Sequence, residues 1–76
     1  MYGARMLRKR SLLLAGHATS VALEPEFWAV LAAAAAARGI SLTALVAEID
    51  AGRGERPLAS ACRLAALDAA RRGGGQ

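Results

Sequence analysis

Residues 18–38 read ATSVALEPEFWAVLAAAAAAR and contain the change of pattern that decides the fold. Polar and apolar residues alternate up to Leu23, which predicts a strand from about Ala18. Its two faces differ in composition, with Thr19, Val21 and Leu23 on one and Ala18, Ser20 and Ala22 on the other. Pro25 suits the first position of a helix and Gly39 suits the left-handed cap that ends one. The stretch therefore predicts a strand followed directly by a helix.

Two more helices are predicted downstream. Ser41 is a suitable N-cap, and the apolar residues that follow recur at the spacing of one helical face: Leu42, Leu45, Val46 and Ile49. Gly52 and Gly54 interrupt this pattern, and Pro57 predicts a third helix that ends at about Arg71. We therefore divide the chain into a flexible basic arm (1–8), a folded domain (9–71) and a disordered glycine-rich tail (72–76).

The residues before the predicted strand are open to two interpretations. Residues 10–14 predict a second strand if Gly16 and His17 form a tight turn. The basic residues ahead of Leu12 to Leu14 are also similar to a secretory signal, but Gly16 and His17 interrupt its apolar part. We expect a cytoplasmic protein.

The composition predicts a thin hydrophobic core. The chain has 76 residues and a net charge of +4, and although 55% of it is hydrophobic, 20 residues are alanine. A single Cys and a single His exclude an intramolecular disulfide and leave too few ligands for a closed zinc site, so we expect no metal and no cofactor. Residues 27–37 form the longest uncharged helical stretch, well short of the roughly 20 residues that span a bilayer.

A lone strand leaves a row of backbone donors and acceptors unpaired, which two copies of the chain would satisfy by pairing their strands. The sequence therefore predicts a homodimer, mostly α with short β, intertwined through an intermolecular antiparallel β-ribbon. Its basic residues lie toward both ends of the chain, a distribution that suits a polyanionic partner but also serves solubility.

Several motifs resemble the ribbon-helix-helix family, which includes the Arc and methionine repressors. They are the stretch from Thr19 to Pro25, the turn from Gly39 to Thr43 and the stripe of Leu45, Val46 and Ile49. Residues 9–11, 15–17, 19–20, 23–28 and 47–50 are similar to a small bacterial branch of that family. The similarity covers roughly residues 8 to 70.

The resemblance implies roles for individual residues. On the strand, Ala18, Ser20 and Ala22 would face DNA, and at the start of the second helix Ser41, Leu42 and Thr43 would offer backbone amides to a phosphate. The expected dimer core consists of Val21, Leu23, Phe27, Trp28, Leu31, Leu45, Val46 and Ile49. Two of the three outward strand residues are alanine, so only Ser20 can hydrogen-bond a base edge.

The cations Arg8, Lys9 and Arg10 are expected to contact flanking phosphates. If residues 10–14 pair with the next strand, the ribbon of a dimer would be four strands wide, whereas a major groove about 12 Å wide admits two. The outer strands would then have to diverge, or DNA would bind another face.

No nucleophile and base recur at a usable spacing, so we expect no enzymatic activity. The leading hypothesis is a transcriptional regulator that binds duplex DNA as a homodimer. The alternative is a protein-interaction module, such as an antitoxin-like dimer that holds a partner protein on its alanine-rich helices or its third helix.

Overall fold

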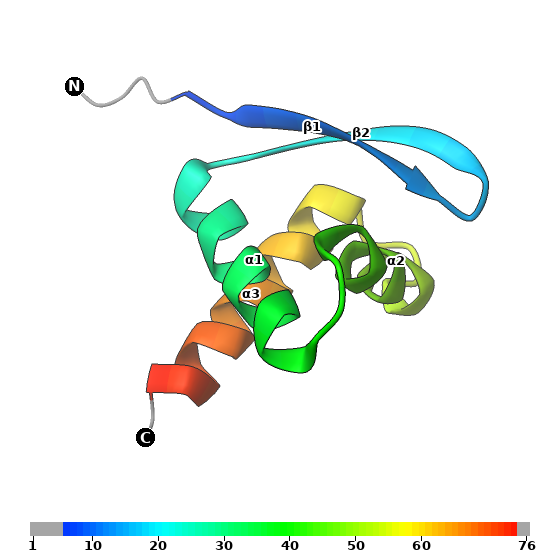
Figure 1. The fold of residues 1–76 in the computed structure, drawn as a ribbon. Coiled ribbons are helices and arrows are strands. Elements are labelled where there is room, and N and C mark those ends of the chain that lie inside the picture. The colour runs from blue at the N-terminus through cyan, green and yellow to red at the C-terminus, as the bar shows by residue number, and fades with distance from the viewer. Residues whose placement is uncertain (1–5, 75–76) are drawn as a thin grey trace.

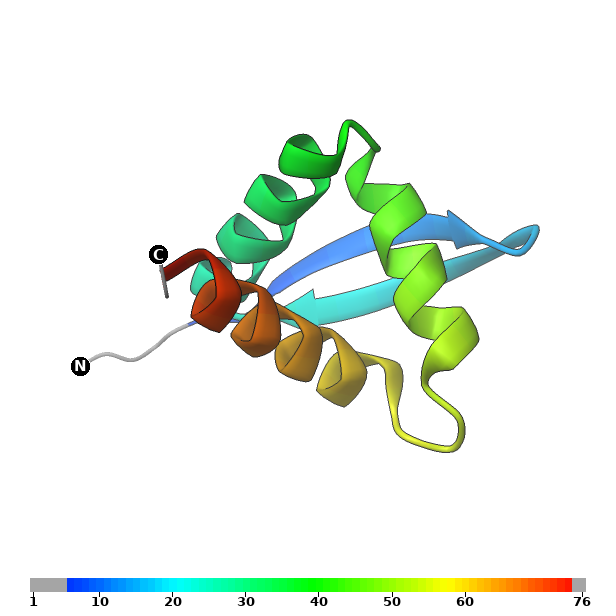
Figure 2. The same ribbon diagram turned by 90° about the horizontal axis from the view of Figure 1, so that it is seen from below.

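The computed structural model describes residues 6–74 and consists of a β-hairpin followed by three helices (Figure 1). The elements are β1 (Arg8–Leu14), β2 (His17–Leu23), α1 (Pro25–Arg38), α2 (Leu42–Gly52) and α3 (Leu58–Gly74). All three helices lie on one side of the hairpin, and α2 crosses beneath it (Figure 2). No described residue covers the other side of the hairpin (Figure 1).

The second strand exists and is longer than residues 10–14. Strand β1 pairs antiparallel with β2 over its whole length, from Arg8 opposite Leu23 to Leu14 opposite His17. The turn consists of Ala15 and Gly16, both with positive φ, of 51° and 83°. Two positive φ values are typical of the type I′ turn, whose twist matches that of the strands. The turn expected at Gly16 and His17 therefore lies one residue earlier.

The helix boundaries confirm most of the capping predictions. Pro25 begins α1, and the Gly39 amide, at φ 73°, donates to the carbonyl oxygens near the helix end. The Ser41 side chain accepts from the Ala44 amide at 2.9 Å and caps α2. Helix α3 continues to Gly74 instead of ending near Arg71, because its last turn has cations at the negative end of the helix dipole and an Arg72–Asp68 ion pair at 2.8 Å.

These elements also shift the expected domain boundaries. Arg8 belongs to β1 and not to an arm, and residues 72–74 belong to α3 and not to a tail. Residues 1–5 of the expected arm and residues 75–76 of the expected tail lie outside the described part of the chain.

The core is assembled within one chain, from the hairpin and all three helices. Its buried members are Leu12, Leu14, Val21, Leu23, Trp28, Leu31, Ala35, Val46, Ala61, Cys62 and Ala66. Phe27, Leu45 and Ile49 are partly buried against it. The residues expected in a dimer core thus pack inside the single chain, and β1 supplies a pairing partner for β2 that a second copy was expected to supply. Whether two copies share this core stays a prediction.

Candidate nucleic-acid interface

The uncovered face of the hairpin is the first part of the candidate interface. Residues that lie opposite each other in a ladder share a face, so the register places Lys9 with Ala22, Ser11 with Ser20, and Leu13 with Ala18 on one side. All six are exposed or partly exposed. Ala18, Ser20 and Ala22 therefore lie on the face away from the helices, and β1 adds a second row of residues to that face. Their contact with DNA stays a prediction.

The sequence alone missed Ser11 and Leu13 as members of this face. Leu13 is 66% exposed, although Leu12 and Leu14 beside it are buried. That alternation in burial follows from the pairing with β2, and the run of three leucines hides it in the sequence. The signal that could have placed these two residues was a turn at Ala15–Gly16, which sets the register with the alternating segment that follows.

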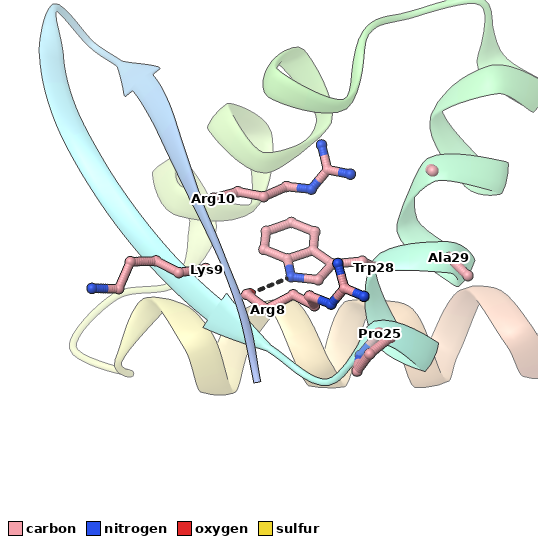
Figure 3. Close-up of a pocket in the computed structure, with 7 residues that line it drawn as sticks. Arg8, Lys9, Arg10, Pro25, Trp28 and Ala29 are labelled. Carbon is pink, nitrogen blue, oxygen red and sulfur yellow. Dashed lines mark hydrogen bonds between the residues drawn. The ribbon is translucent and has the colours of Figure 1, made fainter. Parts of the chain in front are cut away.

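The three neighbouring cations do not form one cluster. Lys9 is on the uncovered face, whereas Arg8 and Arg10 lie opposite Leu23 and Val21 on the face that the helices cover. Figure 3 shows Lys9 pointing away from the other two, whose guanidinium groups lie near Trp28. The expected grouping of these residues is thus divided between two faces of the hairpin.

Most other charged groups of the described residues are paired. Arg38 donates to both carboxylate oxygens of Glu48 at 2.7 and 3.0 Å. Further ion pairs join Arg53 to Asp50, Arg63 to Glu24, and Arg72 to Asp68. Among residues 6–74 the cations without an ion pair are Arg8, Lys9, Arg10, Arg56 and Arg71. Three of these five are consecutive in β1, so the unneutralised positive charge is concentrated at one end of the hairpin.

The start of α2 is the second part of the candidate interface. Ser41 caps the Ala44 amide, and the Ser41 carbonyl accepts from the Leu45 amide at 3.0 Å. The amides of Leu42 and Thr43 find no acceptor among residues 6–74, as expected for the first turn of a helix. They can therefore donate to an anion. Because α2 lies on the covered side of the hairpin, a single chain does not bring these amides together with Ser20 (Figure 1).

Two ion pairs hold the helices in place: one joins α1 to α2, and the other joins α3 to the residue before α1. The bidentate hydrogen bonds from Arg38 lower the pKa of the Glu48 carboxyl and raise that of the Arg38 guanidinium. The hydrogen bond from Arg63 lowers the pKa of Glu24, the residue that joins β2 to α1. The guanidinium of Arg63 also lies 5.8 Å from the centre of the Phe27 ring. Helix α3 is thus attached to the junction between the hairpin and α1.

The ribbon-helix-helix domain family matches residues 7–70, which include the hairpin, α1, α2 and most of α3. The chain belongs to that family. Ribbon-helix-helix domains generally bind DNA, in transcription regulators or antitoxins, and are non-enzymatic modules. The chain matches no curated protein and no solved structure significantly.

The described residues assemble neither a candidate metal site nor a single membrane-spanning helix. No group of three or more His, Cys, Asp or Glu side chains within residues 6–74 could hold a metal ion. Within the same range, no single helix is long and apolar enough to cross a membrane. Helices α1 and α2 together pass that test on length and composition, but the chain bends by 102° between them.

Proposed function

We propose that this ribbon-helix-helix protein binds duplex DNA as a homodimer and acts as a transcriptional regulator. The observation that carries the proposal is the concentration of unpaired cations on β1, one of which, Lys9, lies on the face of the hairpin that no described residue covers. Phosphate neutralisation by such cations supplies affinity with little sequence information.

The hairpin constrains how the dimer would meet a groove. If two β2 strands pair, the sheet has the order β1, β2, β2, β1, and neighbouring strands lie about 4.8 Å apart. The outer strands would then be about 14 Å apart, which exceeds a major groove about 12 Å wide. We therefore expect only the two β2 strands to enter the groove, while the β1 strands lie over the phosphates at its edges.

This arrangement assigns different roles to the two strands. Lys9, on the uncovered face of β1, would contact a phosphate, and Arg8 and Arg10 would add to the positive field around it. On β2, Ser20 is the residue able to hydrogen-bond a base edge, and Ala18 and Ala22 offer only methyl contacts. Ser41, Leu42 and Thr43 would hold a flanking phosphate through the free amides of α2. The expected result is DNA binding with weak sequence discrimination.

A salt series on a short duplex tests the proposal. The logarithm of the binding constant should fall steeply and linearly with the logarithm of the salt concentration. Lys9→Gln should make this slope shallower by about one for each phosphate that the lysine neutralises. Arg71→Gln on α3 removes the same charge at a distance from the hairpin and is the matched control. A flat salt dependence in the unaltered protein would contradict DNA binding.

A protein-interaction module, as in antitoxins, is the second candidate, and exposed leucines on α3 favour it. Leu64 and Leu67 are 46% and 48% exposed and lie on one face of this helix. Such a pair of apolar side chains suits an apolar partner surface. A single stoichiometric protein that copurifies with the chain and is lost on Leu64→Gln plus Leu67→Gln, with DNA affinity unchanged, would support this function instead.

A further inference from the structure

Arg8 and Arg10 occupy an unusual position for unpaired cations. They belong to the same face of the hairpin as the buried Leu12 and Leu14, since alternate residues of a strand share a face. Near the start of β1, the buried apolar side chains of the sheet on this face come from β2 alone, from Val21 and Leu23. Both guanidinium groups instead lie between the hairpin and α1 (Figure 3).

Together with Lys9, the two arginines line a hollow of about 540 Å³ that is open to solvent. Its α1 side consists of Pro25, Trp28, Ala29 and Ala32. Because the alanine side chains are short, they leave room between the helix and the two arginines. No acidic residue lines the hollow. It falls within the range of about 300 to 1,000 Å³ found for small-molecule sites.

Trp28 fixes the geometry of the hollow. Its indole Nε1–H donates to the Arg8 carbonyl oxygen at 2.8 Å, which ties the start of β1 to α1. The Arg10 guanidinium carbon lies 5.3 Å from the centre of the indole ring, a cation–π distance. Trp28 is itself only 5% exposed. Trp28 therefore ties the backbone of Arg8 and lies beside the guanidinium of Arg10, although both arginines remain exposed.

Neither arginine is neutralised by the described residues. No carboxylate within residues 6–74 pairs with Arg8 or Arg10. Glu24 and Glu26 line a neighbouring hollow together with Arg8. Glu24 is bound by Arg63 at 2.9 Å, and Glu26 forms no ion pair with Arg8. Two like charges thus share one face of a strand with no counter-charge bound to either.

We propose that this hollow binds a phosphomonoester of a small organic molecule. A guanidinium presents a planar fork that matches two oxygens of a phosphate, and two such groups suit a group that carries a charge of about −1.5 to −2 at neutral pH. The remaining volume accommodates the organic part against Pro25, Ala29 and Ala32. The site lies on the opposite face of the hairpin from Ser20, so the proposal does not depend on the proposed DNA binding.

Intrinsic fluorescence tests the proposal directly, because Trp28 is the only tryptophan in the chain. The full chain is titrated, without DNA, with glycerol 3-phosphate and separately with inorganic phosphate, at constant ionic strength set by sodium chloride. We expect a saturable change in emission for both anions, and tighter binding of the glycerol ester. Phosphorus NMR line broadening provides a readout that does not depend on the ring. A change that does not saturate, or that chloride reproduces, would overturn the proposal.

Substitutions locate the binding. Arg8→Gln and Arg10→Gln should each weaken glycerol 3-phosphate binding at least tenfold by phosphorus NMR, and Arg71→Gln should leave it unchanged. Circular dichroism establishes that each variant is folded. A Gln variant that is not folded is replaced by Lys at the same position, which keeps the charge but lacks the planar fork and at Arg8 or Arg10 should still weaken binding of the ester. Equal losses in all three Gln variants would indicate a general charge effect and overturn the site.

A competition experiment distinguishes the two sources of phosphate. A short duplex is added to the protein saturated with glycerol 3-phosphate. Retention of the ester in the presence of DNA supports a separate small-molecule site. Displacement of the ester with the stoichiometry of DNA binding would assign the arginines to the DNA backbone and overturn the proposal. If the protein does not bind DNA, the fluorescence titration still tests the small-molecule site, because it is carried out without DNA.

Discussion

At the scale of single residues, the strained position in this fold is Ala15. Its φ of 51° lies in the left-handed region, which costs an L-residue about 1–2 kcal/mol. Asn tolerates this region and precedes Gly in many type I′ turns. We expect Ala15→Asn to raise the free energy of unfolding by about 0.5–1 kcal/mol, as measured by urea denaturation. Ala15→Val, which is β-branched, should lower it. Destabilisation by Asn would show that the turn adopts another geometry.

The environment of Cys62 leads to a prediction about the reactivity of its thiol. Its side chain is fully buried, and burial raises the pKa of the thiol, with a smaller contribution from the charge of Asp50. Because the thiolate is the reactive form, the folded protein should react very slowly with an aromatic disulfide reagent at neutral pH. The rate should rise with urea in parallel with the unfolded fraction. Rapid reaction without denaturant would place the thiol at the surface.

Features that depend on a single residue and its near neighbours could be assigned from the sequence. Pro25, Gly39 and Ser41 could be assigned correctly because each acts through its own backbone geometry or a bond three residues away. The faces of Arg8 and Arg10 could not be assigned. Cations usually face solvent, and the direction of these two follows from the register with β2 and from the space beside Ala29 and Ala32.

Among the elements, β2 has two faces on which we expect substitutions to have different effects on stability. Val21 is 3% exposed, so Val21→Asp buries an unpaired carboxylate, which we expect to prevent folding. Ser20 is exposed, and Ser20→Ala should change the free energy of unfolding by less than about 0.5 kcal/mol. Thermal unfolding followed by circular dichroism compares the two. Equal effects would mean that the faces of the strand are reversed.

The attachment of α3 to the hairpin predicts a dependence of stability on pH. The folded-state pKa of Glu24 is below its ordinary value of 4.5 because Arg63 donates to the carboxylate. A lowered folded pKa stabilises the protein above the unfolded value, and that stabilisation is lost as the pH falls through the folded value. The urea midpoint should therefore decrease below pH 4.5 and decrease less in Glu24→Gln. Glu48, whose pKa Arg38 lowers, acts in the same direction. An identical pH profile in Glu24→Gln would exclude this contribution.

Strand β1 is the element that the sequence did not decide, either in its existence or in its length. A run of three leucines after three cations has no polar and apolar alternation, so its pattern alone does not decide whether it is a strand. The deciding feature is the Ala15–Gly16 turn, which returns the chain so that β1 pairs with β2. Local propensity alone does not reveal such a pairing, because its stabilisation comes from the ladder and from burial of Leu12 and Leu14.

At the scale of the whole molecule, the hairpin changes what holds a dimer together. The core is already assembled within one chain, so the dimer expected from the sequence would rest on backbone pairing between β2 strands. In a hairpin with a two-residue turn, the pair that closes the turn exchanges both hydrogen bonds, and the pairs then alternate. Counting from Leu14 and His17, the backbone amides of Ser20 and Ser11 both point away from the partner strand.

These two serines provide a matched test of the dimer. They lie opposite each other, share the uncovered face, and differ in the edge to which each amide points. Ser20→Pro removes a donor from the open edge of β2 and Ser11→Pro removes one from the open edge of β1, and proline is tolerated at such positions. We expect native mass spectrometry to show that Ser20→Pro becomes monomeric while Ser11→Pro remains a dimer. A dimer that survives Ser20→Pro and is abolished by Ser11→Pro would place β1 at the centre of the ribbon, and Lys9 would then lie in the groove instead of at its edge.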